Sequence, residues 1–287
     1  MKLGRFAVTA LLLVACGQLV MAQGTYTQID VPGALDTECV GVNNAGGIAG
    51  IFDNADGNWQ GFYLSGQSFT AINYPNALST FLNAVNDAGQ IAGYALMPGS
   101  IYVGFTYDVS SSIFTEIQYP GATATLPYAI NNAGTVGGAI ERGASVLGFE
   151  LVGASYRRII PPNESYSGVS GVTGTGELLV GASDGNAESN FLFDQGKYQP
   201  ITIRNLPGAI PIAIDSGGDA LAGVYEAGGS QGFLFERRSL QHIQFPNSYG
   251  TYIGGVNDEL EVVGNFQDKS GHYHGFTWTP PGTDEKN

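Results

Sequence analysis

The most regular feature of the chain is a pattern of apolar and polar positions that occurs six times. Each copy has a short apolar stretch ending in Val or Ile, a turn rich in Asn, Asp and Gly, and a second apolar stretch. The copies start at intervals of 43, 45, 42, 42 and 42 residues. Their Val or Ile positions are Val42, Val85, Ile130, Val172, Ile214 and Val256. A repeat of this length is typical of a β-propeller blade.

Each repeat predicts four strands. The first strand ends at the Val or Ile, and the second ends in a glycine: Gly50, Gly93, Gly138, Gly181, Gly223 and Gly264. The third strand carries a phenylalanine, followed two residues later by another large apolar side chain. These phenylalanines are Phe62, Phe105, Phe149, Phe191, Phe233 and Phe276. Since a strand has a period of two, both side chains lie on one face. A short turn at 65–68 then leads to a fourth strand at 69–72.

The ends of the repeat array predict how the ring closes. The last repeat ends after its third strand, at 274–279, whereas residues 26–29 read as an unpaired fourth strand. Pairing the two segments removes an open sheet edge. We therefore predict an all-β, six-bladed propeller of four-stranded antiparallel blades over residues 23–280, with a polar tail at 281–287. An open solenoid would need capping sequences, which we do not find.

The composition supports this fold. The 287 residues include 43 Gly, 15 Tyr and 15 Phe, and 43% are hydrophobic. Glycine suits tight turns and aromatic residues suit strands, while the apolar content excludes a disordered chain.

The first 22 residues predict export. Lys2 and Arg5 precede an apolar run at 6–15 that is too short to span a bilayer, so we expect a signal peptide cleaved after Ala22. The alternative is a lipoprotein signal ending in Cys16, which would carry a lipid anchor. The protein is thus expected to be secreted, periplasmic or extracellular, or an outer-surface lipoprotein, with no transmembrane segment.

Charge narrows the partners further. Cleavage after Ala22 removes two basic residues and no acid, which moves the net charge from −14 to −16. Such a protein repels nucleic acid, so we expect no nucleic-acid partner. We expect a monomer.

One recurring phrase resembles a known family. Val42-Asn43-Asn44-Ala45-Gly46-Gly47-Ile48-Ala49-Gly50, followed later by Gly-Phe and Phe-Thr-x-Ile, is similar to the HAF family of extracellular repeat proteins. The resemblance covers all six repeats and weakens in the fourth, where Thr173-Gly174-Thr175-Gly176 replaces the Asn-containing turn. It implies bacterial export and repetition, and it supplies no catalytic residues.

Candidate ligand residues gather in the loops of one predicted face. Acids occur between the second and third strands of five repeats, and aromatic side chains flank those loops or the interblade loops. Aromatic faces beside carboxylates are typical of sugar-binding sites. The candidates are Asp53, Asp56, Trp59, Tyr102, Tyr128, Glu141, Tyr166, Asp184, Glu226, Tyr252, Asp268 and Tyr273. The alternative is that the acids reflect an acidic protein and the rings fill gaps between blades.

Two weaker metal signals are present. Asp53 and Asp56 place oxygen ligands at spaced positions before Gly57, which suggests a calcium loop, although the terminal Glu of an EF-hand is missing. His272 and His274 could share one strand face, with Asp268 as a third ligand for Zn²⁺. No cofactor is assigned from the sequence; calcium at the loop of Asp53 and Asp56 is the candidate. The alternative for the two histidines is a solvent-facing pair that binds no metal.

No catalytic constellation emerges from the sequence. Two Gly-x-Ser-x-Gly matches do not precede a helix, and three histidines make a Ser-His-Asp triad improbable. The sequence therefore favours a non-catalytic binding module for polysaccharide or another hydroxyl-rich extracellular ligand. The alternatives are a glycosidase, lyase or lactonase with its site at the central channel, or a protein-interaction scaffold.

Overall fold

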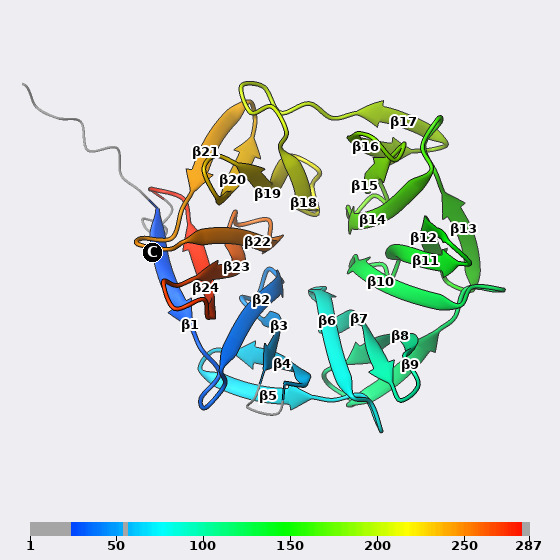
Figure 1. Cartoon of the computed structure of the whole chain (residues 1–287), viewed down its shortest axis with the longest axis horizontal. Helices are drawn as coiled ribbons and strands as arrows, with labels where there is room; N and C mark the ends of the chain where they lie inside the picture. The colour runs from blue at the N-terminus through cyan, green and yellow to red at the C-terminus, as the bar shows by residue number, and fades with distance from the viewer. Residues whose placement is uncertain (1–23, 54–56, 283–287) are drawn as a thin grey trace, which may run out of the picture.

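The chain folds into six antiparallel sheets arranged as blades around a central channel (Figure 1). This computed structural model describes residues 24–53 and 57–282. Each sheet has four strands, which confirms the predicted six-bladed propeller. The described residues contain no helix, and hence none that could cross a bilayer. The predicted signal peptide, Cys16 and most of the predicted tail lie outside the described ranges.

In blades 1 to 5 the strands run in chain order from the channel outwards. Blade 1 contains β2 (Asp36–Val42), β3 (Ile48–Asp53), β4 (Trp59–Ser65) and β5 (Ser68–Ile72). Blade 2 contains β6 (Ser79–Val85), β7 (Gln90–Met97), β8 (Ile101–Asp108) and β9 (Ile113–Ile117). Blade 3 contains β10 (Ala124–Ile130), β11 (Val136–Arg142), β12 (Ser145–Val152) and β13 (Ser155–Ile159).

The second half of the ring follows the same plan. Blade 4 contains β14 (Tyr166–Val172), β15 (Leu178–Ser183), β16 (Glu188–Asp194) and β17 (Lys197–Pro200). Blade 5 contains β18 (Ile210–Ile214), β19 (Ala220–Glu226), β20 (Ser230–Glu236) and β21 (Ser239–Ile243). Blade 6 contains β22 (Gly250–Val256), β23 (Val262–Gln267), β24 (Tyr273–Thr279) and the N-terminal strand β1 (Thr25–Ile29).

Strand β1 closes the ring, as predicted. It pairs antiparallel with β24, from Thr25 opposite Thr279 to Ile29 opposite Gly275. The Tyr26 ring lies 5.4 Å from the Phe245 ring and 6.4 Å from the Trp278 ring. Closure therefore combines backbone pairing with aromatic packing.

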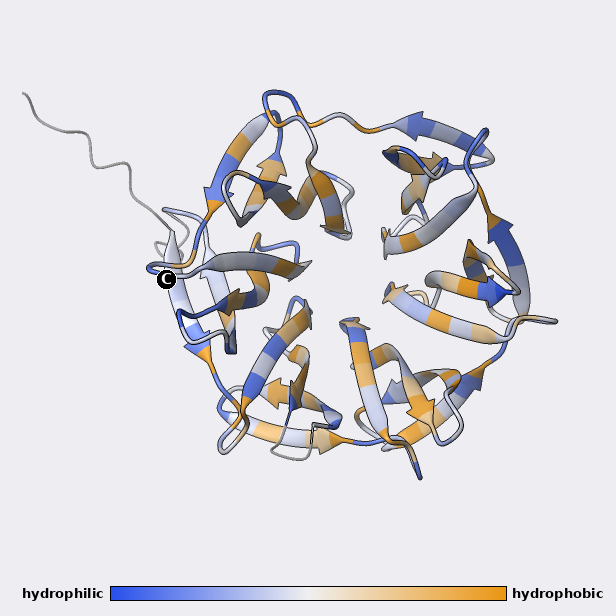
Figure 2. Ribbon diagram, viewed as in Figure 1, coloured by the Kyte–Doolittle hydropathy of each residue, from blue (hydrophilic) through white to orange (hydrophobic). Residues whose placement is uncertain are grey.

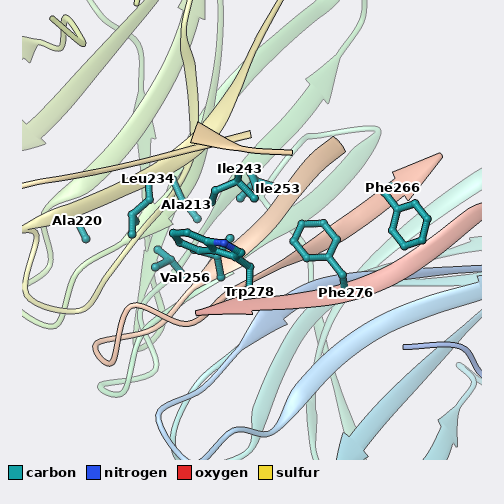
Figure 3. Packing of buried hydrophobic residues seen from close by; sticks show 11 residues of the cluster. Ala213, Ala220, Leu234, Ile243, Ile253, Val256, Phe266, Phe276 and Trp278 are labelled. Carbon is teal, nitrogen blue, oxygen red and sulfur yellow. The ribbon is translucent and has the colours of Figure 1, made fainter. Parts of the chain in front are cut away.

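The core lies between neighbouring blades. Where blades 5 and 6 meet, Trp278 and Phe276 pack with Leu234, Ile243 and Ile253 (Figure 3). In the ribbon, hydrophobic segments recur within every blade, while the loops are mostly hydrophilic (Figure 2). Because each blade buries one apolar surface against its neighbour, the ring is a single folded unit.

The prediction that each second strand ends at its glycine was wrong, because all six strands continue past it, as β3 does to Asp53. In the fourth repeat the glycine is also displaced by one residue. In the other five blades the predicted glycine pairs with the third-strand phenylalanine, as Gly50 does with Phe62. In blade 4 this place is taken by Val180, which pairs with Phe191, and Gly181 comes one residue later. The Val180 side chain is fully buried, and Phe191 is only half-buried.

Each innermost strand contains a β-bulge. The pairing register shifts at one residue, two positions before the final Val or Ile of the strand. Such a residue leaves the hydrogen-bond ladder and changes the direction of its side chain. The bulge residues are Val40, Asn83, Tyr128, Ser170, Ile212 and Gly254, and all six line the central channel.

Candidate site at the central channel

The channel encloses a cavity of about 380 Å³ lined by the innermost strands of all six blades. This size lies within the usual range for small-ligand pockets. One end is formed by the turns between first and second strands, which we call the turn face. The other end, which we call the loop face, lies where the innermost strands begin.

A hydrogen-bonded collar surrounds the channel at the turn face. Asn44 Nδ2 donates to Asp87 Oδ2 at 3.0 Å and to Asp258 Oδ2 at 2.8 Å. Asn132 Nδ2 donates to the same Asp87 oxygen at 2.6 Å, and Ser216 Oγ donates to Asp258 Oδ2 at 2.6 Å. Burial alone would raise the pKa of Asp258, but the hydrogen bonds from Ser216 and Asn44 hold it below its usual value. The collar carboxylates are therefore satisfied by neighbouring blades.

A second series of bonds supports the collar from within. Asn43 Nδ2 donates to the Asn86 carbonyl at 3.1 Å, Asn86 to the Asn131 carbonyl at 2.9 Å, and Asn131 to the Thr173 carbonyl at 2.8 Å. Asn257 joins the last blade to the first through the Asn43 carbonyl, at 3.1 Å. These contacts support a structural role for the Asn-containing turns.

Glu38 is the carboxyl group at the loop-face end of the cavity. It lies on β2, and its nearest polar partner is Asn265 Nδ2, at a long 3.4 Å from Oε2. Burial, assisted by the neighbouring charge of Asp36, raises the pKa of Glu38 to about 7. A proton on this group is consequently exchanged near neutral pH.

Aromatic side chains gather beside the same end of the channel. On blade 2, the Tyr94 ring stacks on Phe81 at 5.0 Å and meets Tyr102 at 5.8 Å and Tyr128 of blade 3 at 6.5 Å. Burial, with the nearby Tyr94 and Glu141, raises the pKa of Tyr128 to about 12.

On the other side of Glu38, blade 6 contributes Tyr252 and Tyr273, whose rings are 6.0 Å apart. Burial and then Tyr252 raise the pKa of Tyr273, and the charges of Glu38 and Asp36 add to the shift. We call these six residues the aromatic arc: Phe81, Tyr94, Tyr102, Tyr128, Tyr252 and Tyr273.

The arc covers only part of the ring. Blades 6, 1, 2 and 3 are consecutive around the channel (Figure 1). On blades 4 and 5, the positions equivalent to Glu38 are Gly168 and Ile210, and the bulge residues are Ser170 and Ile212. The aromatic arc and Glu38 therefore come from blades 6, 1, 2 and 3, whereas the matching positions of blades 4 and 5 are small or aliphatic.

Four predicted ligand residues, Tyr102, Tyr128, Tyr252 and Tyr273, belong to the arc, and Glu141 lies near Tyr128. Asp53 pairs across the sheet with Trp59, whose half-buried ring packs against the core of blades 1 and 2. Asp56 lies outside the described residues, so the calcium loop stays a prediction.

The other predicted acids have contacts within their own blades. Asp184 accepts hydrogen bonds from the Asn186 and Ala187 amides, both at 2.8 Å. Glu226 accepts from Ser230 Oγ at 2.6 Å, and Tyr166 is 45% exposed at the start of β14. These residues are not brought together with the arc.

His274 lies in β24 and His272 directly precedes this strand, and the two side chains lie beside different carboxylates. His272 Nδ1 lies 3.3 Å from Asp36 Oδ1. His274 Nδ1 lies 2.8 Å from Asp30 Oδ1, and its Nε2 lies 3.6 Å from Asp268 Oδ2. Hydrogen bonds, chiefly from Ser270, lower the pKa of Asp268 to about 2. Across residues 24–53 and 57–282, no group of three or more His, Cys, Asp or Glu is arranged to hold a metal ion.

Sequence reasoning missed Glu38, Phe81 and Tyr94. The sequence signal that could have found Glu38 and Phe81 is the variation in residue type at one position of an otherwise regular repeat. Four residues before the Val or Ile, the six copies carry Glu, Phe, Leu, Gly, Ile and Tyr. A position whose residue varies from repeat to repeat, while the backbone stays the same, gives each blade a different side chain beside the channel.

Comparison with known proteins shows the fold. No family model matches the chain. No curated protein matches either. Among solved structures, a TolB-like protein from Agrobacterium tumefaciens is 9% identical, with 85% of this chain and 90% of that chain covered and a TM-score of 0.58. A putative gluconolactonase is 14% identical, covers 90% and 92%, and has a TM-score of 0.55.

A third neighbour is a six-bladed lectin from Aleuria aurantia that recognises fucose. It is 12% identical, with 90% of this chain and 99% of the lectin covered, and has a TM-score of 0.51. The neighbours thus include a lectin and an enzyme-like protein, and at these identities they establish a six-bladed propeller and no particular activity.

Proposed function

We propose that this protein is an extracytoplasmic binding module that holds a hydroxyl-rich ligand, such as an oligosaccharide, at the aromatic arc without turning it over. The observation that carries the proposal is the aromatic arc beside one end of the cavity, where Tyr128 lines the cavity with Glu38 and Tyr273 lies near Glu38. Aromatic rings can stack on the apolar face of a sugar, while tyrosine hydroxyls and carboxyl oxygens bond its hydroxyl groups. The propeller neighbours include a lectin, which is compatible with this role.

The proposed location depends on the N-terminal segment. Residues 1–22 have the pattern of an export signal, and we infer that the mature chain begins near Gln23 or, in the lipoprotein alternative, at Cys16. Mass measurement of the exported protein separates these outcomes, because lipidation adds mass at Cys16.

A glycan array followed by calorimetry tests binding. We expect Tyr128→Ala to weaken the interaction by about 2–12-fold, since one aromatic contact contributes about 0.5–1.5 kcal/mol. Tyr166→Ala, on the same face but outside the arc, is the matched control. Binding by neither the wild type with calcium nor the wild type without it would refute the proposal. Binding only with calcium would support the loop at Asp53 and Asp56.

A second candidate function is favoured by Glu38. A carboxyl group that exchanges its proton near neutral pH in a cavity can act as a general acid or base. In that case Glu38→Gln would retain ligand affinity and abolish product formation, measured by mass spectrometry of the incubated ligand. An unchanged ligand after prolonged incubation with the wild type favours the binding module.

A further inference from the structure

The cavity has an uneven charge. Its lining includes the carboxyl groups of Glu38, Asp87 and Asp258 and, among the described residues, no Lys, Arg or His. Because opposing charges are absent, the channel attracts cations and repels anions.

Within residues 24–53 and 57–282, Glu38 has fewer hydrogen-bond partners than the other two carboxyl groups. Asp87 and Asp258 already accept hydrogen bonds from the collar residues Asn44, Asn132 and Ser216. Glu38 has the single long contact with Asn265. In the described part of the chain, the ion pairs of acidic groups with arginine involve Glu150 and Glu236 and not Glu38.

The surroundings of Glu38 favour a cation as its partner. Phe81 lies on the neighbouring blade on one side, and Tyr252 and Tyr273 lie on the blade on the other side. Ring faces attract ammonium groups, and the attraction is larger where water is excluded. A partly buried carboxyl group that has no basic partner is also stabilised in its charged form by an incoming positive charge.

We propose that the ligand carries a protonated amine that pairs with Glu38, so that the preferred hydroxyl-rich ligand is an amino sugar with a free amino group. This inference rests on the proposed function and specifies its ligand class. A neutral sugar would leave Glu38 unpaired, whereas a glucosamine unit offers both a stacking ring face and an ammonium group.

A proton should be released when the amine binds. The pKa of Glu38 is raised to about 7 mainly by burial, so at a pH of about 6 this group is largely protonated in the free protein. An ammonium beside it favours the carboxylate, and the proton leaves to the buffer. No covalent bond changes in this exchange.

Calorimetry with two probes tests the inference. The glucosamine tetramer carries free amines, and the N-acetylglucosamine tetramer has the same rings without the charge. We expect the first to bind the wild type about 10-fold more tightly at pH about 6, corresponding to roughly 1.4 kcal/mol. The binding heat should depend on the ionisation enthalpy of the buffer, which reports proton release.

Two variants test whether the preference for the free amine depends on Glu38. Glu38→Gln should bind both tetramers with similar affinity and release no proton, because glutamine resembles the protonated acid. Glu116→Gln, in an exposed acid of the outer strand β9 that accepts a hydrogen bond from the Tyr74 hydroxyl, should behave as the wild type. Thermal unfolding of both variants confirms that they remain folded.

The outcomes separate the two proposals. Equal binding of both tetramers by the wild type, or an amine preference that survives Glu38→Gln, overturns the amine inference and leaves the binding module standing. Binding of neither tetramer and of no other array glycan overturns the binding module, and the inference with it.

Discussion

At the scale of the residue, a glycine without a β-carbon allows a neighbouring strand and an aromatic ring to pack directly against the backbone. A methyl group at Gly138 would overlap the Leu126 carbonyl oxygen and would lie 2.8 Å from the ring of Phe149. At Gly181 no atom lies within 4 Å of the same position. The two glycines look alike in sequence, but only the first is required by packing.

This contrast predicts that a Gly→Ala substitution lowers the free energy of unfolding by different amounts at the two positions. Gly138→Ala should lower the free energy of unfolding by about 1–3 kcal/mol, because the strand pair must separate to admit the methyl group. Gly181→Ala should change it by less than about 1 kcal/mol, since the site has room and an ordinary backbone conformation. Guanidinium denaturation of both variants measures the difference, and equal losses would contradict the packing argument.

At the scale of the element, strand β1 holds the ring together through a few side chains. Its tyrosine, Tyr26, touches Phe245, Phe276 and Trp278, and its hydroxyl accepts a hydrogen bond from the Gln244 amide at 3.1 Å. Burial is the main cause of the raised pKa of this tyrosine. The N-terminal strand is therefore part of the fold and not a tail.

We expect Tyr26→Ala to destabilise the protein by about 2–4 kcal/mol and to loosen β1 from β24, because it removes a large aromatic contact. With only two tryptophans in the chain, Trp278 reports this event in a Trp59→Phe background. Its fluorescence should shift to longer wavelength as water reaches the ring. Phe114→Ala, in the outer strand β9 of blade 2, is the control, because it removes an aromatic ring from a core cluster that contains no residue of β1 or β24. An unchanged Trp278 spectrum in Tyr26→Ala would contradict the role of this contact.

At the scale of the whole molecule, the interfaces between neighbouring blades, which we call seams, differ in the hydrogen bonds that join their turns. The series of buried asparagine bonds ends at blade 4, where Thr173 stands in place of Asn, and Asp215 replaces Asn in blade 5. The turns of these two blades are joined by the Gly174 amide bonding the Ser216 carbonyl at 2.8 Å. The interface between blades 4 and 5 thus lacks the side-chain amide bond that the interface between blades 3 and 4 keeps.

Introducing a side-chain amide at position 173 should strengthen the seam between blades 4 and 5. Thr173 Oγ1 accepts from the Glu177 amide at 2.9 Å, as Asn43 Oδ1 accepts from the Gly47 amide at 2.7 Å, so asparagine fits the same turn. Thr173→Asn should add about 0.5–1.5 kcal/mol of stability through a new bond to the Asp215 carbonyl. Asn131→Thr, the reverse change one blade earlier, should remove a comparable amount. Thermal unfolding measures both, and a loss of stability in Thr173→Asn would refute the argument.

Much of this architecture was predictable because it is encoded locally. The turn at Asn43 forms through hydrogen bonds within five residues, and the alternation around Phe62 specifies a strand face without reference to distant segments. Repetition of these signals determined the number of blades, and the missing fourth strand determined the partner of β1. The error at Gly181 arose because a glycine one residue away matched the expected spacing.

The candidate site required the tertiary structure because its members come from separate repeats. Glu38, Tyr128 and Tyr273 are far apart in the chain and lie near the channel only after the ring closes. The burial that raises the pKa of Glu38 and the separation of His272 from His274 likewise depend on contacts between the ends of the chain. The sequence by itself determined a closed six-bladed propeller, since turns and strand periodicity act over short distances. Only the tertiary structure decided that the aromatic arc and Glu38 gather beside one end of its channel, since that grouping is the sum of single residues contributed by four different blades.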